Sequence, residues 1–154
     1  MNDYVDIIDI EGVQYDIQDT PTKTQAEENA QKIEELENLD LYSLEEIQTA
    51  SKWIDNKPIY RKVIATGALP NATQKSVPHG IANMDKVVKI LGVAENPTSR
   101  AFAVLPLVSG TAGASVLVTA YTDRIVMQTG SNWSVFSSSY IILEYTKTTD
   151  TSQP

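Results

Sequence analysis

The spacing of apolar and polar residues changes along the chain, from a strand-like period to a helical one and back again. Residues 4–10 are rich in β-branched residues, and residues 13–17 alternate apolar with polar side chains, which is typical of short strands. Gly12 lies between the two runs and supplies the permissive backbone of a turn. The pattern predicts a β-hairpin within residues 1–20. Because an isolated hairpin is marginally stable in water, we expect it to pack against a helix of its own chain, a sister subunit or another protein.

A helix is predicted within residues 21–40, because Asp19-Thr20-Pro21 is a helix-start signal and a helical pattern then continues to about Leu39. Its apolar positions are sparse and its flanks are dense with glutamate, so its narrow stripe suits two or three helices packed along one axis. An ordinary amphipathic helix, in which Ala30 and Leu39 form a stripe with Ile33 and Leu36 that faces the hairpin, is the alternative. The predicted oligomer seam has heptad spacing and consists of Thr22, Ala26, Asn29, Ile33 and Leu36.

Residues 41–51 are expected to form a linker with one helical turn. Ser43 and Glu46 have the spacing of a capping box, which favours a short helix through Ile47 and Ala50. An extended segment that leads into a strand at Trp53 is the alternative.

From Trp53 onward the apolar period is two, and short β-forming runs are separated by turn residues. Trp53 and Ile54 favour a strand, Asp55-Asn56 tolerate the positive φ of a short hairpin, and Pro58 starts the return strand or lies on an edge. About eight short strands without intervening helices predict a mainly β fold, an antiparallel, jelly-roll-like sandwich over residues 52–147. The polar residues 148–154 are expected to fray. The clearest later strands are predicted at residues 59–65, 74–81, 86–93, 101–108, 115–122, 124–129 and 140–146.

Two of these runs are apolar at every position instead of alternating. They are Val116-Leu117-Val118 and Ile141-Ile142-Leu143. A strand of this kind is buried on both faces, so we expect one face to contact the core and the other a neighbouring subunit.

Charge is distributed unevenly between the two parts of the chain. The net charge of −8 combines −12 over residues 1–46, which hold 14 acidic residues and two lysines, with +4 over residues 47–154, which hold six acidic and ten basic residues. The acidic front argues against nucleic-acid binding, which needs concentrated positive charge. No apolar run approaches the ~18 residues of a membrane span, and the first residues have no secretion-signal pattern.

Candidate catalytic chemistry is sparse. The chain has no cysteine, which excludes thiolate chemistry. Its single histidine, His79, excludes a histidine metal cluster, and no partners for it in a catalytic triad can be identified. We expect His79 to have a structural or surface role. Phosphate-loop and calcium-loop spacings are absent, so the sequence predicts no enzyme, no cofactor and no metal site.

Four aromatic residues are candidates for a surface that binds sugars, since flat rings stack on sugar rings. A place in the core is the alternative for most of them. They are Trp53, Tyr121, Trp133 and Tyr140.

Three stretches of the β region resemble a module of tailed-bacteriophage fibre proteins, including head fibres. They are Trp53-Ile54-Asp55-Asn56-Lys57-Pro58-Ile59-Tyr60-Arg61-Lys62, Gly67-Ala68-Leu69-Pro70-Asn71 and His79-Gly80-Ile81, within a similarity that spans residues 42–145. Asn56 stands where the module usually has glycine, and asparagine also tolerates positive φ.

The resemblance implies a homotrimeric virion protein, made in the bacterial cytoplasm, with a receptor-binding β-sandwich. Residues 1–20 would attach to capsid or tail proteins, and the sandwich would bind a host-surface glycan or protein. A capsid-stabilising protein without a host ligand is the alternative within this class. A monomeric carbohydrate-binding module is the alternative from another class.

Overall fold

The structure is a computed structural model, and it describes residues 7–10, 13–16, 23–38, 41–111 and 113–151. Side chains are described for residues 25–33, 41–111 and 113–151. Two compact units make up the chain, Met1–Glu37 and Asn38–Pro154, and the second unit is called the head below.

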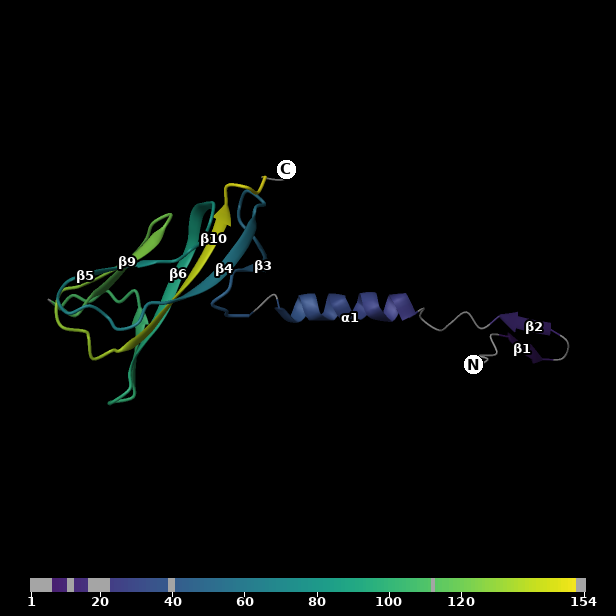
Figure 1. The fold of residues 1–154 in the computed structure, drawn as a ribbon, viewed down its shortest axis with the longest axis horizontal. Helices are drawn as coiled ribbons and strands as arrows, with labels where there is room; N and C mark the ends of the chain where they lie inside the picture. Colours follow the sequence, from purple (N-terminus) through teal and green to yellow (C-terminus); the bar gives the residue numbers. More distant parts are fainter. Residues whose placement is uncertain (1–6, 11–12, 17–22, 39–40, 112, 152–154) are drawn as a thin grey trace. The chain divides into compact units, whose positions relative to one another are not determined.

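The first unit contains the predicted hairpin and nearly all of the predicted helix (Figure 1). Strands β1 (Ile7–Ile10) and β2 (Val13–Asp16) pair antiparallel, with Ile7 opposite Asp16 and Ile10 opposite Val13. Helix α1 spans Lys23–Asn38. The hairpin and the helix are therefore confirmed. The hairpin turn at Gly12 and the start signal at Asp19-Thr20-Pro21 lie outside the described residues.

The head is built from two antiparallel sheets (Figure 1). The larger has the order β3-β4-β10-β6-β7 and the smaller has the order β5-β9-β8. Strand β10 is central in the larger sheet and pairs antiparallel with both β4 and β6. The strands are β3 (Ile47–Lys52), β4 (Pro58–Ala65), β5 (Gln74–Pro78), β6 (Met84–Asn96), β7 (Ala101–Leu105), β8 (Val116–Ala120), β9 (Arg124–Thr129) and β10 (Ser138–Lys147).

One hydrophobic core joins the two sheets. Ile141, Leu143 and Tyr145 of β10 are fully buried and belong to the same cluster as Ile125 and Met127 of β9. These side chains sit at alternate positions of their strands, as expected where one face of each sheet packs on the other. The mainly β, sandwich-like fold predicted from the sequence is thereby confirmed. Within the described residues, no helix combines the length and apolar character that crossing a membrane requires.

The prediction of a linker with a helical turn at residues 41–51 is wrong. Residues 47–52 form β3, which pairs with β4 and brings Ile47 opposite Arg61. The Ser43 side chain accepts a hydrogen bond from the Glu45 backbone at 3.0 Å, while Glu46 bonds to Tyr145 and Lys147 far along the chain. Strand pairing with β4 and the side-chain bonds of Glu46 to β10 therefore override the local helix signal.

The hairpin predicted around Asp55-Asn56 is present, but its first strand ends one residue before Trp53. The Trp53 carbonyl accepts a hydrogen bond from Asn56, which has a φ of 61°, and Pro58 begins β4 as predicted. Ile54 is not in a strand, because it lies at the turn and is 88% exposed. Strand β7 ends just before Pro106 and lies at the edge of the larger sheet, where proline is tolerated because no ladder hydrogen bond is lost.

Candidate interaction surface

The larger sheet has a second face, directed away from the core, on which apolar side chains form rows across the strands. In one row Tyr140 of β10 lies between Ala65 of β4 and Val93 of β6, and Val93 in turn faces Val104 of β7. In the next row Ile142 lies between Val63 and Leu91. Residues that pair across strands project from the same face of a sheet. We call this surface the outer apolar face and define it by Leu91, Val93, Phe102, Val104, Tyr140 and Ile142.

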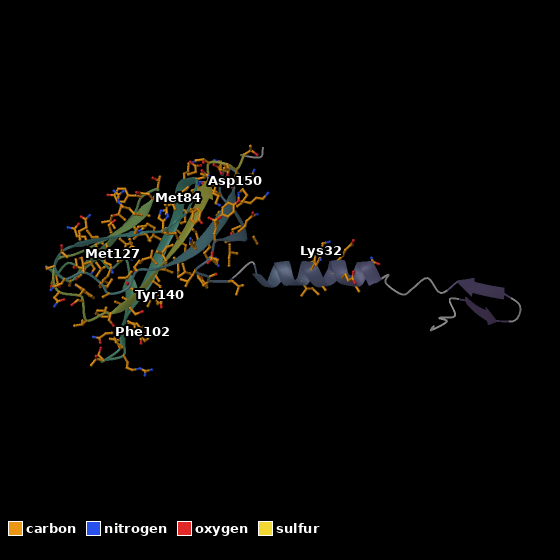
Figure 2. All side chains as sticks on the ribbon, in the orientation of Figure 1. Lys32, Met84, Phe102, Met127, Tyr140 and Asp150 are labelled. Atoms are coloured by element: carbon orange, nitrogen blue, oxygen red, sulfur yellow. The ribbon has the colours of Figure 1, made fainter. Side chains whose placement is uncertain are left out.

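These apolar side chains are accessible to solvent, most of all on the edge strand β7. Phe102 is 66% and Val104 63% exposed, whereas Leu105, the next residue of the same strand, is fully buried in the core. Phe102 and Tyr140 lie at the same end of the head, away from Asp150 (Figure 2). Contiguous exposed apolar patches on soluble proteins mark sites of interaction. The outer apolar face is therefore the candidate functional surface of the head.

A charged row borders the outer apolar face on one side. Glu144 of β10 lies between Arg61 of β4 and Lys89 of β6, and its carboxylate contacts their side chains at 2.9 and 3.7 Å. The side chains of Arg61 and Glu144 are nearly buried, while that of Lys89 is half exposed. The Arg61 guanidinium also stacks over the Tyr42 ring, 4.7 Å from its centroid. The border of the face thus consists of charges that are paired within the chain.

A second ionic cluster fixes the segment before β3 to the end of β10. The Tyr145 hydroxyl and the Lys147 ammonium both donate hydrogen bonds to the Glu46 carboxylate. Burial opposes ionisation of Glu46, but the bonds from Lys147 and Tyr145 outweigh it and hold the pKa of Glu46 below its ordinary value. Burial, together with the bond to Glu46, raises the pKa of Tyr145. This cluster holds the structure together and lies apart from the rows of the outer apolar face.

A third pair joins the β3–β4 turn to β6. The Lys57 ammonium donates to the Asp85 carboxylate at 2.7 Å and to the Lys147 carbonyl at 3.4 Å. The hydrogen bond with Asp85 raises the pKa of Lys57, and the same bond lowers the pKa of Asp85. These contacts fix the turn of the hairpin that the sequence predicted around Asp55-Asn56.

His79 is buried, and both of its ring nitrogens are engaged. Nδ1 accepts a hydrogen bond from the Ile81 backbone at 3.0 Å, so Nε2 carries the proton that it donates to the Tyr121 carbonyl at 3.0 Å. The ring therefore joins the loop after β5 to the turn between β8 and β9. This arrangement agrees with the structural role predicted from the sequence. Among the described residues, no group of three or more acidic or histidine side chains is placed to hold a metal ion.

The four candidate sugar-binding aromatics come from four separate elements of the head. Trp53 is half-buried in the β3–β4 turn, and Tyr121 lies in the β8–β9 turn beneath the Arg124 guanidinium, 4.5 Å from its ring centroid. Trp133 lies in the loop before β10, whereas Tyr140 belongs to the outer apolar face.

A shallow open cavity of about 330 Å³ lies beside Trp133. The indole donates a hydrogen bond to the Gly113 carbonyl at 3.1 Å, and its ring centroid lies 5.3 Å from that of Phe136. The Asn132 side-chain oxygen accepts bonds from the backbone and hydroxyl of Ser134. Aromatic rings beside amide and hydroxyl groups are the kind of lining that suits a sugar.

The predicted oligomer seam is only partly described. The side chains of Ala26, Asn29 and Ile33 are exposed on α1, and Ile33 is 56% exposed. Thr22 lies outside the described residues, and the Leu36 side chain is not among those described, although Leu36 belongs to α1. The seam itself therefore stays a prediction.

Sequence reasoning found only part of the outer apolar face. The uninterrupted run Ile141-Ile142-Leu143 predicted burial on two faces, and Ile142 does project outward, half-buried, between two buried neighbours. Phe102 and Val104 were missed, although Ala101–Leu105 is apolar at every position, which is the same signal. The corresponding run on β8 leaves Leu117 exposed on the smaller sheet.

Comparisons with known proteins identify no relative: no protein-family model, curated protein or solved structure matches the chain. Its function is therefore inferred from the geometry of the chain itself and from the resemblance of its motifs.

Proposed function

We propose that this chain is a structural protein of a tailed-phage particle, a homotrimeric head or tail fibre. Residues 1–20 attach to capsid or tail proteins, α1 associates with its counterparts, and the head is displayed for contact with the host surface. The protein works by binding and not by catalysis. The resemblance of residues 42–145 to phage fibre modules supports the assignment to the virion.

The observation that carries this proposal is the outer apolar face. Phe102, Val104 and Tyr140 are exposed together on one sheet, and a contiguous apolar patch of this kind is often a site of interaction. The pairing of Glu144 with Arg61 and Lys89 gives the same surface a polar border, as in protein–protein interfaces. Such a face is expected in a protein that functions by assembly.

The first unit supports the same conclusion. All described side chains from residue 25 to residue 33 are exposed, including the apolar Ile33, and only two residues of the helix, Ile33 and Leu36, are large and apolar. Isolated helices of this length are marginal in water, and packing normally stabilises them. A partner helix along the seam supplies that packing in the proposed fibre.

The proposed mechanism is multivalent attachment. Three heads on one fibre bind three copies of a surface ligand, and the linkage converts the second and third contacts into intramolecular events. Weak individual affinities then combine into strong attachment. A capsid-decorating protein without a host ligand uses the same assembly but lacks this last step.

A carbohydrate-binding module is a second candidate, and the cavity beside Trp133 is the specific observation that favours it. Because Trp133 and Phe136 form part of its lining, sugar binding there changes tryptophan fluorescence. A monomer that binds host glycans through this cavity would favour the module over the fibre. A trimer that binds the same glycans would place the cavity within the fibre proposal.

The test is immunogold labelling of purified particles of a phage that encodes this sequence, with an antibody raised against the head. The proposal predicts label on projections from the capsid or from the tail, and the position distinguishes a head fibre from a tail fibre. Particles that carry no label, in preparations where the chain is found only in the lysate, would contradict a virion role.

A further inference from the structure

We propose that the outer apolar face binds the same face of further copies of this chain, so that the heads meet along β10, β6 and β7. This inference rests on the proposed function and deepens it, because it names the occupant of the surface. It also places an assembly interface in the head, in addition to the predicted seam on α1.

The first argument is the banded arrangement of the face. The two apolar rows, one centred on Tyr140 and one on Ile142, cross the strands, and the charged row centred on Glu144 lies beyond them on the same side. When two copies associate with their strands in the same direction, the apolar rows of one copy face the apolar rows of the other, and the charged rows face each other. The interface then has an aromatic and aliphatic centre and a polar rim, as protein interfaces do.

The second argument is charge. In the charged row that forms the rim, Glu144 contacts Arg61 and Lys89 of the same chain. Most of the charge of this row is therefore neutralised within the chain, so two identical rows do not strongly repel each other. The rows centred on Tyr140 and Ile142 consist of uncharged residues, and Phe102 lies in the next row, opposite Glu95. A nucleic acid or an anionic membrane would need a concentration of unpaired cations on this surface, whereas a second uncharged face is its natural complement.

The third argument is size. The face with its rim is roughly 14 Å wide, since it crosses four strands that lie about 4.8 Å apart. It is roughly 20 Å long, since it covers six residues of about 3.4 Å each along a strand. This area of roughly 300 Å² includes the charged rim, and it is comparable to the largest apolar patch on a typical soluble monomer, which is often a functional site. It falls below the approximately 800 Å² per partner of a stable protein–protein interface. The heads alone are therefore expected to associate weakly, and the seam on α1 completes the interface.

The described part of the first unit is a poor alternative occupant. From residue 25 to residue 33 its apolar side chains are limited to Ala26, Ala30 and Ile33, among glutamates, glutamines and a lysine. A segment with one large apolar side chain is poorly matched in composition to two rows of them.

The test is hydroxyl-radical footprinting of the full-length protein, combined with its absolute mass from light scattering. Tyr140 and Tyr121 form a matched pair, because they are 44% and 46% exposed in the single chain and lie on different surfaces. The inference predicts an oligomer in which Tyr140 and Phe102 are oxidised several-fold more slowly than expected from their exposure, while Tyr121 reacts at the rate its exposure sets. Dilution to monomer restores the reactivity of Tyr140.

The other outcomes separate this inference from the proposed function. An oligomer in which Tyr140 reacts as fast as Tyr121 would overturn the interface on the sheet and leave the fibre proposal standing on the α1 seam. A monomer with protected Tyr140 would show that a segment of the same chain covers the face. A monomer with reactive Tyr140 would overturn both the inference and the homotrimeric fibre.

Discussion

The Tyr145 hydroxyl donates a hydrogen bond to the Glu46 carboxylate and joins residues 99 positions apart in the sequence. The Tyr145 ring is fully buried and stacks on Tyr60, with ring centroids 6.1 Å apart. Glu46 directly precedes β3, so this one bond connects the start of the edge strand to the central strand β10. The contact explains why the segment before Trp53 belongs to the head and is not a linker.

Removal of this hydroxyl tests the contribution of the contact to stability. Tyr145→Phe keeps the buried ring but deprives Glu46 of one of its two donors, and we expect a loss of about 1–2 kcal/mol in the free energy of unfolding. Urea titration followed by tryptophan fluorescence measures the change. Tyr121→Phe removes a hydroxyl from an exposed ring and serves as the control, with an expected change within about 0.5 kcal/mol. Equal effects of the two variants would show that the Glu46 contact contributes nothing specific.

Two paired carboxylates, Glu46 of this cluster and Asp85 of the pair with Lys57, predict sensitivity to acid. The pKa values of Glu46 and Asp85 are lower in the folded protein than their ordinary values of 4.5 and 3.8. Their stabilising contribution is therefore fully present above pH 4.5 and is lost as the pH falls through the lowered folded values. The urea midpoint should decrease as the pH falls below 4.5.

The double variant Glu46→Gln with Asp85→Asn is the control for this pH dependence. It should be less stable at pH 7 and should lose part of the decrease below pH 4.5. A slope that is identical in the variant and in the unmodified protein would assign the acid sensitivity to other groups.

Gly92 allows β6 and β10 to approach closely within the larger sheet. A Cβ atom at this position would lie 2.6 Å from both the Ile141 Cδ1 atom and the Tyr140 carbonyl oxygen. Gly92→Ala is therefore expected to destabilise the head by about 1–3 kcal/mol through overpacking. Gly110→Ala is the matched control, since nothing described lies within 4 Å of its Cβ position. A lower thermal midpoint is expected for the first variant only, and a Gly92→Ala protein as stable as the control would contradict the close packing of β10 on β6.

A charge on the outer apolar face should weaken assembly without unfolding the head. Val104→Lys places an ammonium among the apolar rows, and we expect the dissociation constant of the oligomer to rise about tenfold or more, which corresponds to about 1.4 kcal/mol. Leu117→Lys alters an exposed apolar residue of the smaller sheet and should leave the constant unchanged. Sedimentation equilibrium gives both values. An effect of Leu117→Lys that exceeds that of Val104→Lys would move the interface to the smaller sheet.

The strands and turns of the head could be predicted from sequence because their signals are local. The positive φ of Asn56, the strand start at Pro58 and the alternation along β9 depend only on neighbouring residues. Strand β3 was missed because its sequence, Ile47-Gln48-Thr49-Ala50-Ser51-Lys52, has a helical capping signal before it and little β preference. Its extended conformation comes from pairing with β4 and from the bond between Glu46 and Tyr145, which no local pattern contains.

The outer apolar face could not be derived for the same reason. Tyr140, Val93 and Val104 are neighbours only because β10 lies between β4 and β6, and β7 lies beside β6. The sequence indicated that β10 is apolar on both sides, but strand order and register decide which residues complete its rows. The candidate sugar-binding aromatics were grouped by chemical type alone, and the fold distributes them over four separate elements of the head.

Assembly of the chain into a trimer is the central claim, and absolute mass by light scattering on a sizing column tests it most directly. The measurement compares the full chain with a chain that begins at Leu41, which keeps the entire core of the head. We predict three times the chain mass for the full protein, and a trimer that dissociates on dilution for the shorter one, because it retains the outer apolar face but lacks the seam on α1. A full-length protein that is monomeric at every concentration would contradict the fibre and the interface together.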